Sequence, residues 1–154
     1  MEQPLWQIHQ KYMARALMLA EQAFDEGEIP VGAIIVKDDR IIGKGYNQTE
    51  RLNDPTAHAE MIAISAACET LEQKYLSECT LYVTLEPCPM CAGAGVWSKL
   101  SRIVYGASDA RSGACGSVLD ITSEKSLNHQ VEIIQGVMEA DCAYFLKEFF
   151  KNKR

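Results

Sequence analysis

The first part of the chain has apolar residues at the spacing of an amphipathic helix. Counted from the first of them, they fall at i, i+3, i+4, i+7 and i+11: Met13, Ala16, Leu17, Ala20 and Phe24. This spacing places them on one helical face, and Gly27 is of the residue type that ends helices. His9 lies in the first turns without a second metal-binding residue type beside it, so we expect it to be solvated or to cap the helix.

Five short apolar segments further along the chain predict β-strands, because each is bounded by turn residues. They are residues 29–36, 41–46, 81–85, 102–106 and 131–134. The polar run 37–40 is expected to join the first two strands as a hairpin turn.

Three more helices are predicted between and after these strands. Residues 48–55 are polar and should form an exposed loop, and Thr56 has the residue type of an N-cap for the helix that carries His58 and Glu60. Pro89 suits the first position of the next helix, where its missing N–H costs little. The last helix is expected from about Met138, with this apolar face: Cys142, Phe145, Leu146 and Phe149.

The order of these elements indicates the fold class. Helices that alternate with strands predict an α/β protein, here a three-layer α/β/α sandwich with a five-stranded mixed sheet. The order of the strands within the sheet does not follow from these patterns. At 154 residues, 47% of them hydrophobic, the chain suits a single domain spanning residues 1–154.

Charge and hydropathy narrow the class of protein further. No apolar run approaches the ~18 residues of a membrane span, and the N-terminus lacks the segments of a signal peptide, so we expect a cytoplasmic protein. Fifteen basic against 21 acidic residues give a net charge of -6. This balance disfavours indiscriminate nucleic-acid binding, and any RNA contact must be local.

Six cysteines without a secretion signal favour thiols and metal ligands over disulfides. Four of them lack metal-ligand spacing, and we expect them to be unreactive, as most free cysteines are small buried hydrophobes: Cys68, Cys79, Cys115 and Cys142.

The other two cysteines form a Cys-x-x-Cys pair. Cys88 and Cys91 are three residues apart at the start of a predicted helix, where thiolates are favoured by the dipole and the free N–H groups. With His58 they make three candidate ligands, and zinc with three protein ligands keeps a fourth position open, as in catalytic sites. Taken alone, the pair would also suit a redox site or half of a structural zinc site.

Glu60 separates these alternatives. Residues two apart on a helix do not share a face, so His58 and Glu60 are poorly placed to bind one ion together. A nearby carboxylate that is not a ligand has no use in a structural or redox site. It is needed in a zinc deaminase, where His-x-Glu followed by Pro-Cys-x-x-Cys is the signature and the Glu transfers protons. The two-part pattern therefore predicts a zinc deaminase.

The chain also resembles the bacterial tRNA-specific adenosine deaminases, of the cytidine deaminase-like superfamily. The resemblance covers nearly the whole chain and is carried by residues 30–33, 45–47, 54–60, 80–88, 90–94, 113–117, 128–129 and 149–150. It implies deamination of adenosine to inosine at the wobble position of an anticodon, one Zn²⁺ per chain, a tRNA anticodon stem-loop as partner and a homodimer.

Residue roles follow from the resemblance and are expectations of the same kind. His58, Cys88 and Cys91 would bind zinc, and Glu60 would transfer the proton from a zinc-activated water. The residues implied to bind the substrate are Asn47 and the Ala59 backbone for the base, Asp109 for the preceding nucleotide, and Phe149, Phe150 and Lys151 for the stem-loop. From the residues alone, Asn47 would be an ordinary turn residue, the two Phe residues core, and Asp109 and Lys151 solvated.

Two other functions stay open at this stage. Pro89 and Trp97 are also found in the related guanine deaminases, which favours a deaminase of free guanine or of another base or nucleoside, although Trp97 is expected to be a core residue. A non-catalytic, zinc-stabilised partner subunit is the third hypothesis, and Glu60 speaks against it. The basic C-terminal residues Lys147, Lys151, Lys153 and Arg154 favour RNA if they are more than a solvated helix end.

Overall fold

The sheet at the centre of the molecule has five strands in the order β2-β1-β3-β4-β5. The protein is described here from a computed structural model, which describes residues 4–152. β1 pairs antiparallel with both β2 and β3, whereas β3, β4 and β5 run parallel. The strands are β1 (Gly32–Lys37), β2 (Arg40–Tyr46), β3 (Thr80–Leu85), β4 (Arg102–Ala107) and β5 (Glu132–Ile134).

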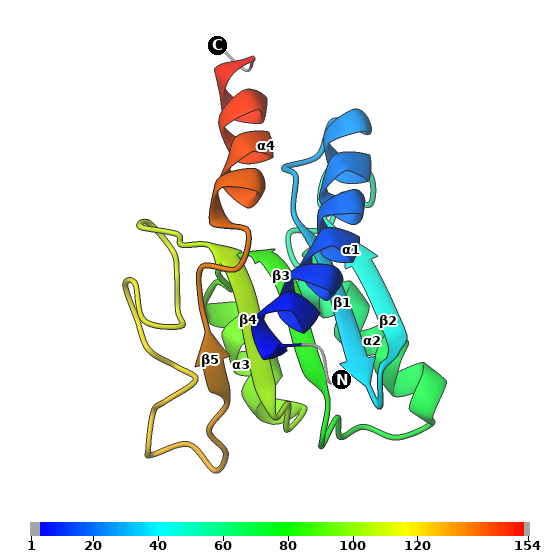
Figure 1. Cartoon of the computed structure of the whole chain (residues 1–154), viewed down its shortest axis with the longest axis vertical. Coiled ribbons are helices and arrows are strands. Elements are labelled where there is room, and N and C mark those ends of the chain that lie inside the picture. The colour runs from blue at the N-terminus through cyan, green and yellow to red at the C-terminus, as the bar shows by residue number, and fades with distance from the viewer. Residues whose placement is uncertain (1–3, 153–154) are drawn as a thin grey trace.

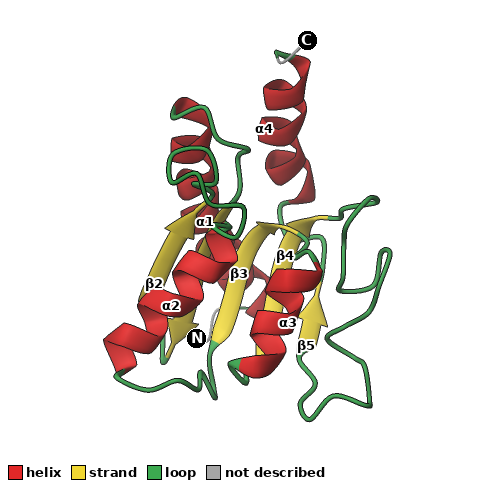
Figure 2. Ribbon diagram, turned by 180° about the vertical axis from the view of Figure 1, so that it is seen from behind, coloured by secondary structure: helices red, strands yellow, loops and turns green. Residues whose placement is uncertain are grey.

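Helices cover both faces of this sheet (Figures 1 and 2). They are α1 (Leu5–Asp25), α2 (Ala59–Leu71), α3 (Pro89–Trp97) and α4 (Glu139–Lys151). One buried cluster joins α2 and α3 to the sheet through Ile35, Val83 and Tyr105. The other joins α1 and α4 to the opposite face through Ile34 and neighbouring buried residues. Alternate strand residues therefore supply two separate cores, and the predicted three-layer sandwich is confirmed.

The hairpin between β1 and β2 is tighter than the sequence predicts. The strands continue through Lys37 and Arg40, which pair with each other, so the turn is reduced to Asp38 and Asp39. Both aspartates have positive φ, 50° and 59°, as a two-residue hairpin turn requires. At its other end β1 begins at Gly32, three residues later than expected.

Two residues lie elsewhere than the sequence predicts. His9 is buried rather than solvated, and its Nδ1 lies 2.8 Å from the hydroxyl of Tyr82 on β3. Trp97 is 72% exposed rather than part of the core. Both errors concern the direction of a helix face, which depends on the partner that the helix packs against.

Several strands and helices begin or finish at the same end of the sheet. β2, β3 and β4 finish at this end, β1 begins there, and α2 and α3 begin beside it (Figures 1 and 2). Within residues 4–152 no helix is both long and apolar enough to cross a membrane.

Candidate metal centre and pocket

Two helix starts bring the three predicted ligands together. His58 is the N-cap residue of α2, and Cys88 is the N-cap residue of α3 with Cys91 one turn into it. Thr56, expected to cap α2, instead bonds to Asp54 through its backbone N–H and its hydroxyl. The cap position is therefore occupied by a metal-binding residue type, and neither His58 nor Cys88 makes a side-chain capping hydrogen bond.

The spacing of the three side chains fits a tetrahedral zinc ion. Nδ1 of His58 lies 3.6 Å from Sγ of Cys88 and 3.5 Å from Sγ of Cys91. Zinc bonds of about 2.05 Å to nitrogen and 2.3 Å to sulfur, at a tetrahedral angle, put these atoms about 3.6 Å apart. The three candidate ligand atoms all lie within 4.8 Å of one another.

The electrostatics of the cluster favour a thiolate. A hydrogen bond from the Cys91 thiol, helped by His58, lowers the pKa of Cys88 from 9.0 to about 4. The same hydrogen bond and burial raise the pKa of Cys91, and the bond to Cys88 raises the pKa of His58. The cluster thus holds negative charge on sulfur at neutral pH, which is the form that binds metal.

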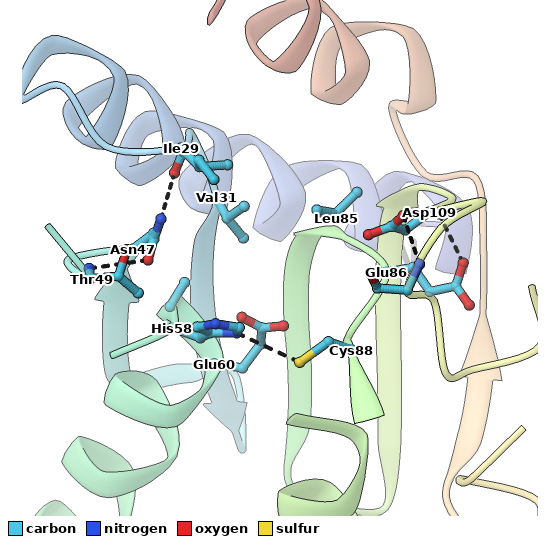
Figure 3. A pocket seen from close by; sticks show the side chains of 12 residues that line it. Ile29, Val31, Asn47, Thr49, His58, Glu60, Leu85, Glu86, Cys88 and Asp109 are labelled. Carbon is cyan, nitrogen blue, oxygen red and sulfur yellow. Dashed lines mark hydrogen bonds between the residues drawn. The ribbon is translucent and has the colours of Figure 1, made fainter. Parts of the chain in front are cut away.

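Glu60 lies in the first turn of α2, next to this cluster. Its side chain is only 4% exposed, and in Figure 3 its carboxylate points toward the space between His58 and Cys88. Burial is the largest cause that raises its pKa from 4.5 to about 7. A carboxyl with a pKa near neutrality can both accept and return a proton.

A cavity of about 260 Å³ opens beside the cluster (Figure 3). The wall on one side comes from the segments before β1 and after β2, and the wall on the other side comes from the end of β3 and the loop after β4. The lining residues are Ile29, Val31, Asn47, Thr49, His58, Ala59, Glu60, Leu85, Glu86, Cys88, Asp109 and Ser112. Two of the three predicted ligands, His58 and Cys88, therefore line one pocket together with Glu60 and three predicted substrate contacts.

Asn47 makes the hydrogen bonds of an ordinary turn residue and also lines the pocket. Its Oδ1 accepts from the N–H of Thr49, two residues on, as in an ordinary turn, and its Nδ2 donates to the carbonyl of Ile29. An Asn side chain has two N–H donors and two acceptor lone pairs. One of each stays available to a ligand in the pocket that Asn47 lines.

Asp109 is half-buried at the pocket wall formed after β4. Its Oδ1 accepts hydrogen bonds from the backbone N–H groups of Arg111 and Ser112, at 2.9 and 3.1 Å. Asp109 therefore shapes its own loop, a role that neither the expected substrate contact nor the alternative of a solvated side chain included.

The aromatic pair near the C-terminus is divided between core and surface. Phe149 is 9% exposed and packs edge-on against Phe24 of α1, with ring centroids 6.3 Å apart. Phe150 is 54% exposed, and Lys151 is exposed in the last turn of α4. Lys153 and Arg154 lie outside the described residues.

Two buried carboxylates near the pocket were not predicted. Glu28 and Glu86 are 1% and 2% exposed, and both accept hydrogen bonds from backbone N–H groups of distant loops. Neither lies in a motif whose spacing marks a buried acid. Their role depends on which loop folds over them, and a single sequence carries no signal for that.

Comparison with known proteins agrees with this geometry. The chain matches the family model of the MafB19-like deaminases over residues 7–154. It is 48% identical, over 93% of its length and 94% of the relative's, to a tRNA-specific adenosine deaminase of Aquifex aeolicus.

Solved structures include a protein from a study of A-to-I editing by tRNA:A34 deaminases at the wobble position of transfer RNA. It has 41% identity and a TM-score of 0.85, and the match covers 88% of this chain and 99% of the other. A guanine deaminase from Nitrosomonas europaea is more distant, with 25% identity and a TM-score of 0.76 over 97% of this chain and 85% of the other. The chain belongs to the family of tRNA-specific adenosine deaminases.

Proposed function

We propose that this chain hydrolyses the amino group of adenosine at the wobble position of a tRNA anticodon, which gives inosine and ammonia. The observation that carries the proposal is the buried Glu60 carboxylate, which faces the cluster of His58, Cys88 and Cys91 in a pocket. A relative that is 48% identical is named as a tRNA-specific adenosine deaminase, and a 41% identical structure comes from a study of tRNA:A34 deaminases that act at the wobble position. A deaminase of free guanine is disfavoured, because the guanine deaminase is only 25% identical.

His58, Cys88 and Cys91 are proposed to hold one zinc ion. The fit rests on one nitrogen and two sulfur ligands at tetrahedral spacing. Bound zinc would leave a coordination position to water and lower the pKa of that water toward about 7.

Glu60 is proposed as the proton carrier of the reaction. Its carboxylate takes a proton from the attacking water and returns protons to the ring nitrogen of adenine and to the departing amine. Burial holds its pKa near 7, so the protonated and ionised forms of the carboxyl are close in free energy and a proton can be taken up and released repeatedly. Oxygen from water replaces nitrogen at C6 of the base, and ammonia leaves.

Asn47 and Ala59 are proposed to bind the edge of the base. The Asn47 side chain is fixed by Ile29 and Thr49, so its spare donor and acceptor have a set direction. Ala59 is the first residue of α2, and the first N–H groups of a helix have no partner within it. A base splayed out of an anticodon loop reaches such groups without the cost of opening a duplex.

Contacts to the rest of the RNA are proposed for Asp109 at the pocket wall and for Phe150 and Lys151 on α4. The exposure of Phe150 supports base stacking there, whereas the burial of Phe149 supports a packing role beneath it. Enzymes that modify tRNA meet it in the cytoplasm, and we place the chain there.

A comparison of substrates tests the activity. The purified, zinc-loaded chain is incubated separately with total tRNA, adenosine and guanine, and inosine and ammonia are measured. We expect inosine in tRNA and little product from the other two. Turnover of guanine without turnover of tRNA would replace the proposal by the free-base alternative.

Removal of one thiol tests the metal. In Cys88→Ala or Cys91→Ala, zinc content and deamination should be lost together, and thermal stability should fall, because metal binding and folding are coupled in such sites. The measurements are elemental analysis and thermal unfolding. Stoichiometric zinc in both variants would refute the proposed ligand set.

A homodimer is also proposed. The 72% exposure of Trp97 supports it, because large exposed aromatic residues are enriched at protein interfaces. Sedimentation equilibrium should give about twice the chain mass of 17.1 kDa, and a mass of one chain would contradict the dimer.

A further inference from the structure

Two buried carboxylates flank the pocket without a cationic partner. Glu28, between α1 and β1, is 1% exposed, and Glu86, just after β3, is 2% exposed. Across residues 4–152 the salt bridges involve other acids, with Arg51 bound to Glu26 and Arg102 to a glutamate on β5. A buried charge is costly unless it is paired or hydrogen-bonded, so the compensation of both carboxylates must come from hydrogen bonds.

All loop donors to the Glu86 carboxylate come from the 108–117 loop, which follows β4. The N–H of Asp109 donates to Oε1 at 3.0 Å, and the N–H groups of Cys115 and Ser117 donate to Oε2, each at 3.1 Å. The Ser117 hydroxyl adds a short hydrogen bond to Oε1. One carboxylate thus fixes both ends of this loop.

The 108–117 loop is also fitted closely around this carboxylate. A Cβ atom at Gly113 would overlap the carboxylate of Glu86, so glycine lets the backbone pass against it. The N–H of Ala114 donates to the carbonyl of Pro87 at 2.9 Å, the residue before the proposed ligand Cys88. The loop is therefore bound to the segment that also presents a metal ligand.

Glu28 makes the same kind of contact on the opposite wall. Its Oε1 accepts from the N–H of Glu50 at 3.0 Å, and its Oε2 accepts from the N–H of Arg51 at 2.8 Å. These donors belong to the 48–55 loop, which follows β2. Hydrogen bonds to a charged acceptor are about twice as strong as neutral ones, so two of them hold this loop against the end of α1.

Each loop supplies part of the pocket wall. Thr49 comes from the 48–55 loop, and Asp109 and Ser112 come from the 108–117 loop. We propose that Glu28 and Glu86 are paired positioning residues, each of which holds one loop in the shape that receives the substrate. The effect on substrate rests on the proposed function, whereas the holding of the loops does not.

Glu→Gln substitutions test this pairing with little change in volume. The new NH₂ group faces backbone N–H groups that need an acceptor, so at least one hydrogen bond is lost and the remaining ones no longer have a charged acceptor. Each loop contains a single trypsin site, Arg51 in one and Arg111 in the other, and both residues are exposed. Cleavage there follows the population of the open loop when reclosure is fast.

Limited trypsin digestion of the zinc-loaded chain should therefore show two separate effects. In Glu86→Gln, cleavage after Arg111 should accelerate about tenfold, or ~1.4 kcal/mol of loop opening, while cleavage after Arg51 stays unchanged. In Glu28→Gln, cleavage after Arg51 should accelerate to a similar extent, while cleavage after Arg111 stays unchanged. Mass spectrometry of the fragments gives both rates from one sample, and each variant is the control for the other.

Two further variants distinguish local opening of a loop from a general loss of stability. Glu132→Gln removes an exposed acid bound to Arg102 and should change neither cleavage rate. Ser117→Ala removes the hydroxyl donor to Glu86 but keeps the backbone donor, and it should accelerate cleavage after Arg111 to a smaller extent, even if Glu86→Gln does not fold. Equal acceleration at both sites in either glutamate variant, or no acceleration in Ser117→Ala, would overturn the proposal.

Kinetics separate positioning from bulk structure. An open loop reduces the fraction of chains ready to bind, so KM for tRNA should rise while kcat at saturation changes less. Glu86→Asp keeps the acceptor charge and should recover part of the KM. If the digestion rates change as expected but the original chain does not deaminate tRNA, the proposed function is wrong, whereas the holding of the loops by Glu28 and Glu86 is supported. If tRNA is deaminated and the pattern is absent, the positioning role is wrong.

Discussion

At the scale of single residues, the chemistry depends on how one carboxyl is surrounded. Glu60 follows His58 by two residues on the first turn of α2, so the two side chains leave the helix in different directions. One reaches the cysteines and the other faces the pocket. Burial then raises the pKa of Glu60 to about 7, and no side chain of this type in open solvent would have that value.

Glu60→Ala should separate chemistry from metal binding. Deamination should fall at least about a hundredfold, which is the usual size of a general acid–base contribution. Zinc should stay near one ion per chain, because the carboxylate is not proposed as a ligand. Inosine formation and elemental analysis check the two parts, and loss of zinc would mean that Glu60 binds the ion.

His9 should make the stability of the fold depend on pH. Burial, followed by the charge of Arg102 and opposed by that of Glu132, lowers the pKa of His9 below its ordinary value of 6.5. As pH falls through 6.5, the unfolded chain binds a proton that the folded chain resists, so stability present above that pH is lost below it.

In His9→Gln the amide can still meet the Tyr82 hydroxyl, but it does not titrate. Between pH 7 and pH 5 the variant should therefore lose less unfolding free energy than the original chain. Urea unfolding at each pH measures the difference between the two chains, in which the titration of all other groups cancels. Parallel pH curves would show that His9 carries no such linkage.

At the scale of elements, the site is made by the starts of two helices set against the sheet. Gly45 on β2 allows this approach, since a Cβ there would overlap the carbonyl oxygen of Ala59, the residue after His58. Nearby Ala63 packs over the same strand. The distance between α2 and β2, and with it the place of the first ligand, therefore depends on a missing side chain.

Gly45→Ala should move the start of α2 outward. We expect a loss of about 1–3 kcal/mol in unfolding free energy from overpacking and weaker zinc binding, measured by denaturant unfolding and by competition with a chelator. Gly93→Ala is the control, since a Cβ there meets nothing within 4 Å. A Gly45→Ala chain as stable as the control would contradict the close approach.

Sequence patterns predict the elements and the ligand set because those signals are local. Periodicity places the strands within a few residues, and the Cys-x-x-Cys spacing puts Cys88 and Cys91 on one turn of α3. Contacts between distant segments leave no such signal. The pairing of β1 with β3, the exposure of Trp97 and the loops held by Glu86 all depend on which surfaces meet after folding.

At the scale of the whole molecule, the net negative charge contrasts with the residues exposed at the end of α4. The chain carries a net charge of -6. The last helix, α4, projects beyond the end of the sheet where the pocket lies (Figure 1), and it ends in exposed Phe150 and Lys151. The RNA contact proposed for the end of α4 would direct an RNA to one place, since the net negative charge of the chain disfavours binding elsewhere.

Replacement of Lys151, Lys153 and Arg154 by Ala should test this direction of binding. tRNA deamination should weaken, and the salt dependence of binding should flatten by about 0.7–0.9 in slope for each phosphate that is no longer neutralised. Zinc content and thermal stability should remain as in the original chain. An unchanged salt response would show that the end of α4 is no RNA surface.

The mixed pairing of the sheet also orders events during synthesis on the ribosome. β1 pairs with both β2 and β3 through residues that precede position 86, and the three proposed ligands are complete at Cys91. β3 then waits for its parallel neighbour β4, and the pocket wall that includes Asp109 emerges later still. A nascent chain therefore contains its proposed metal-binding side chains before its pocket is complete, and metal binding can precede completion of the pocket.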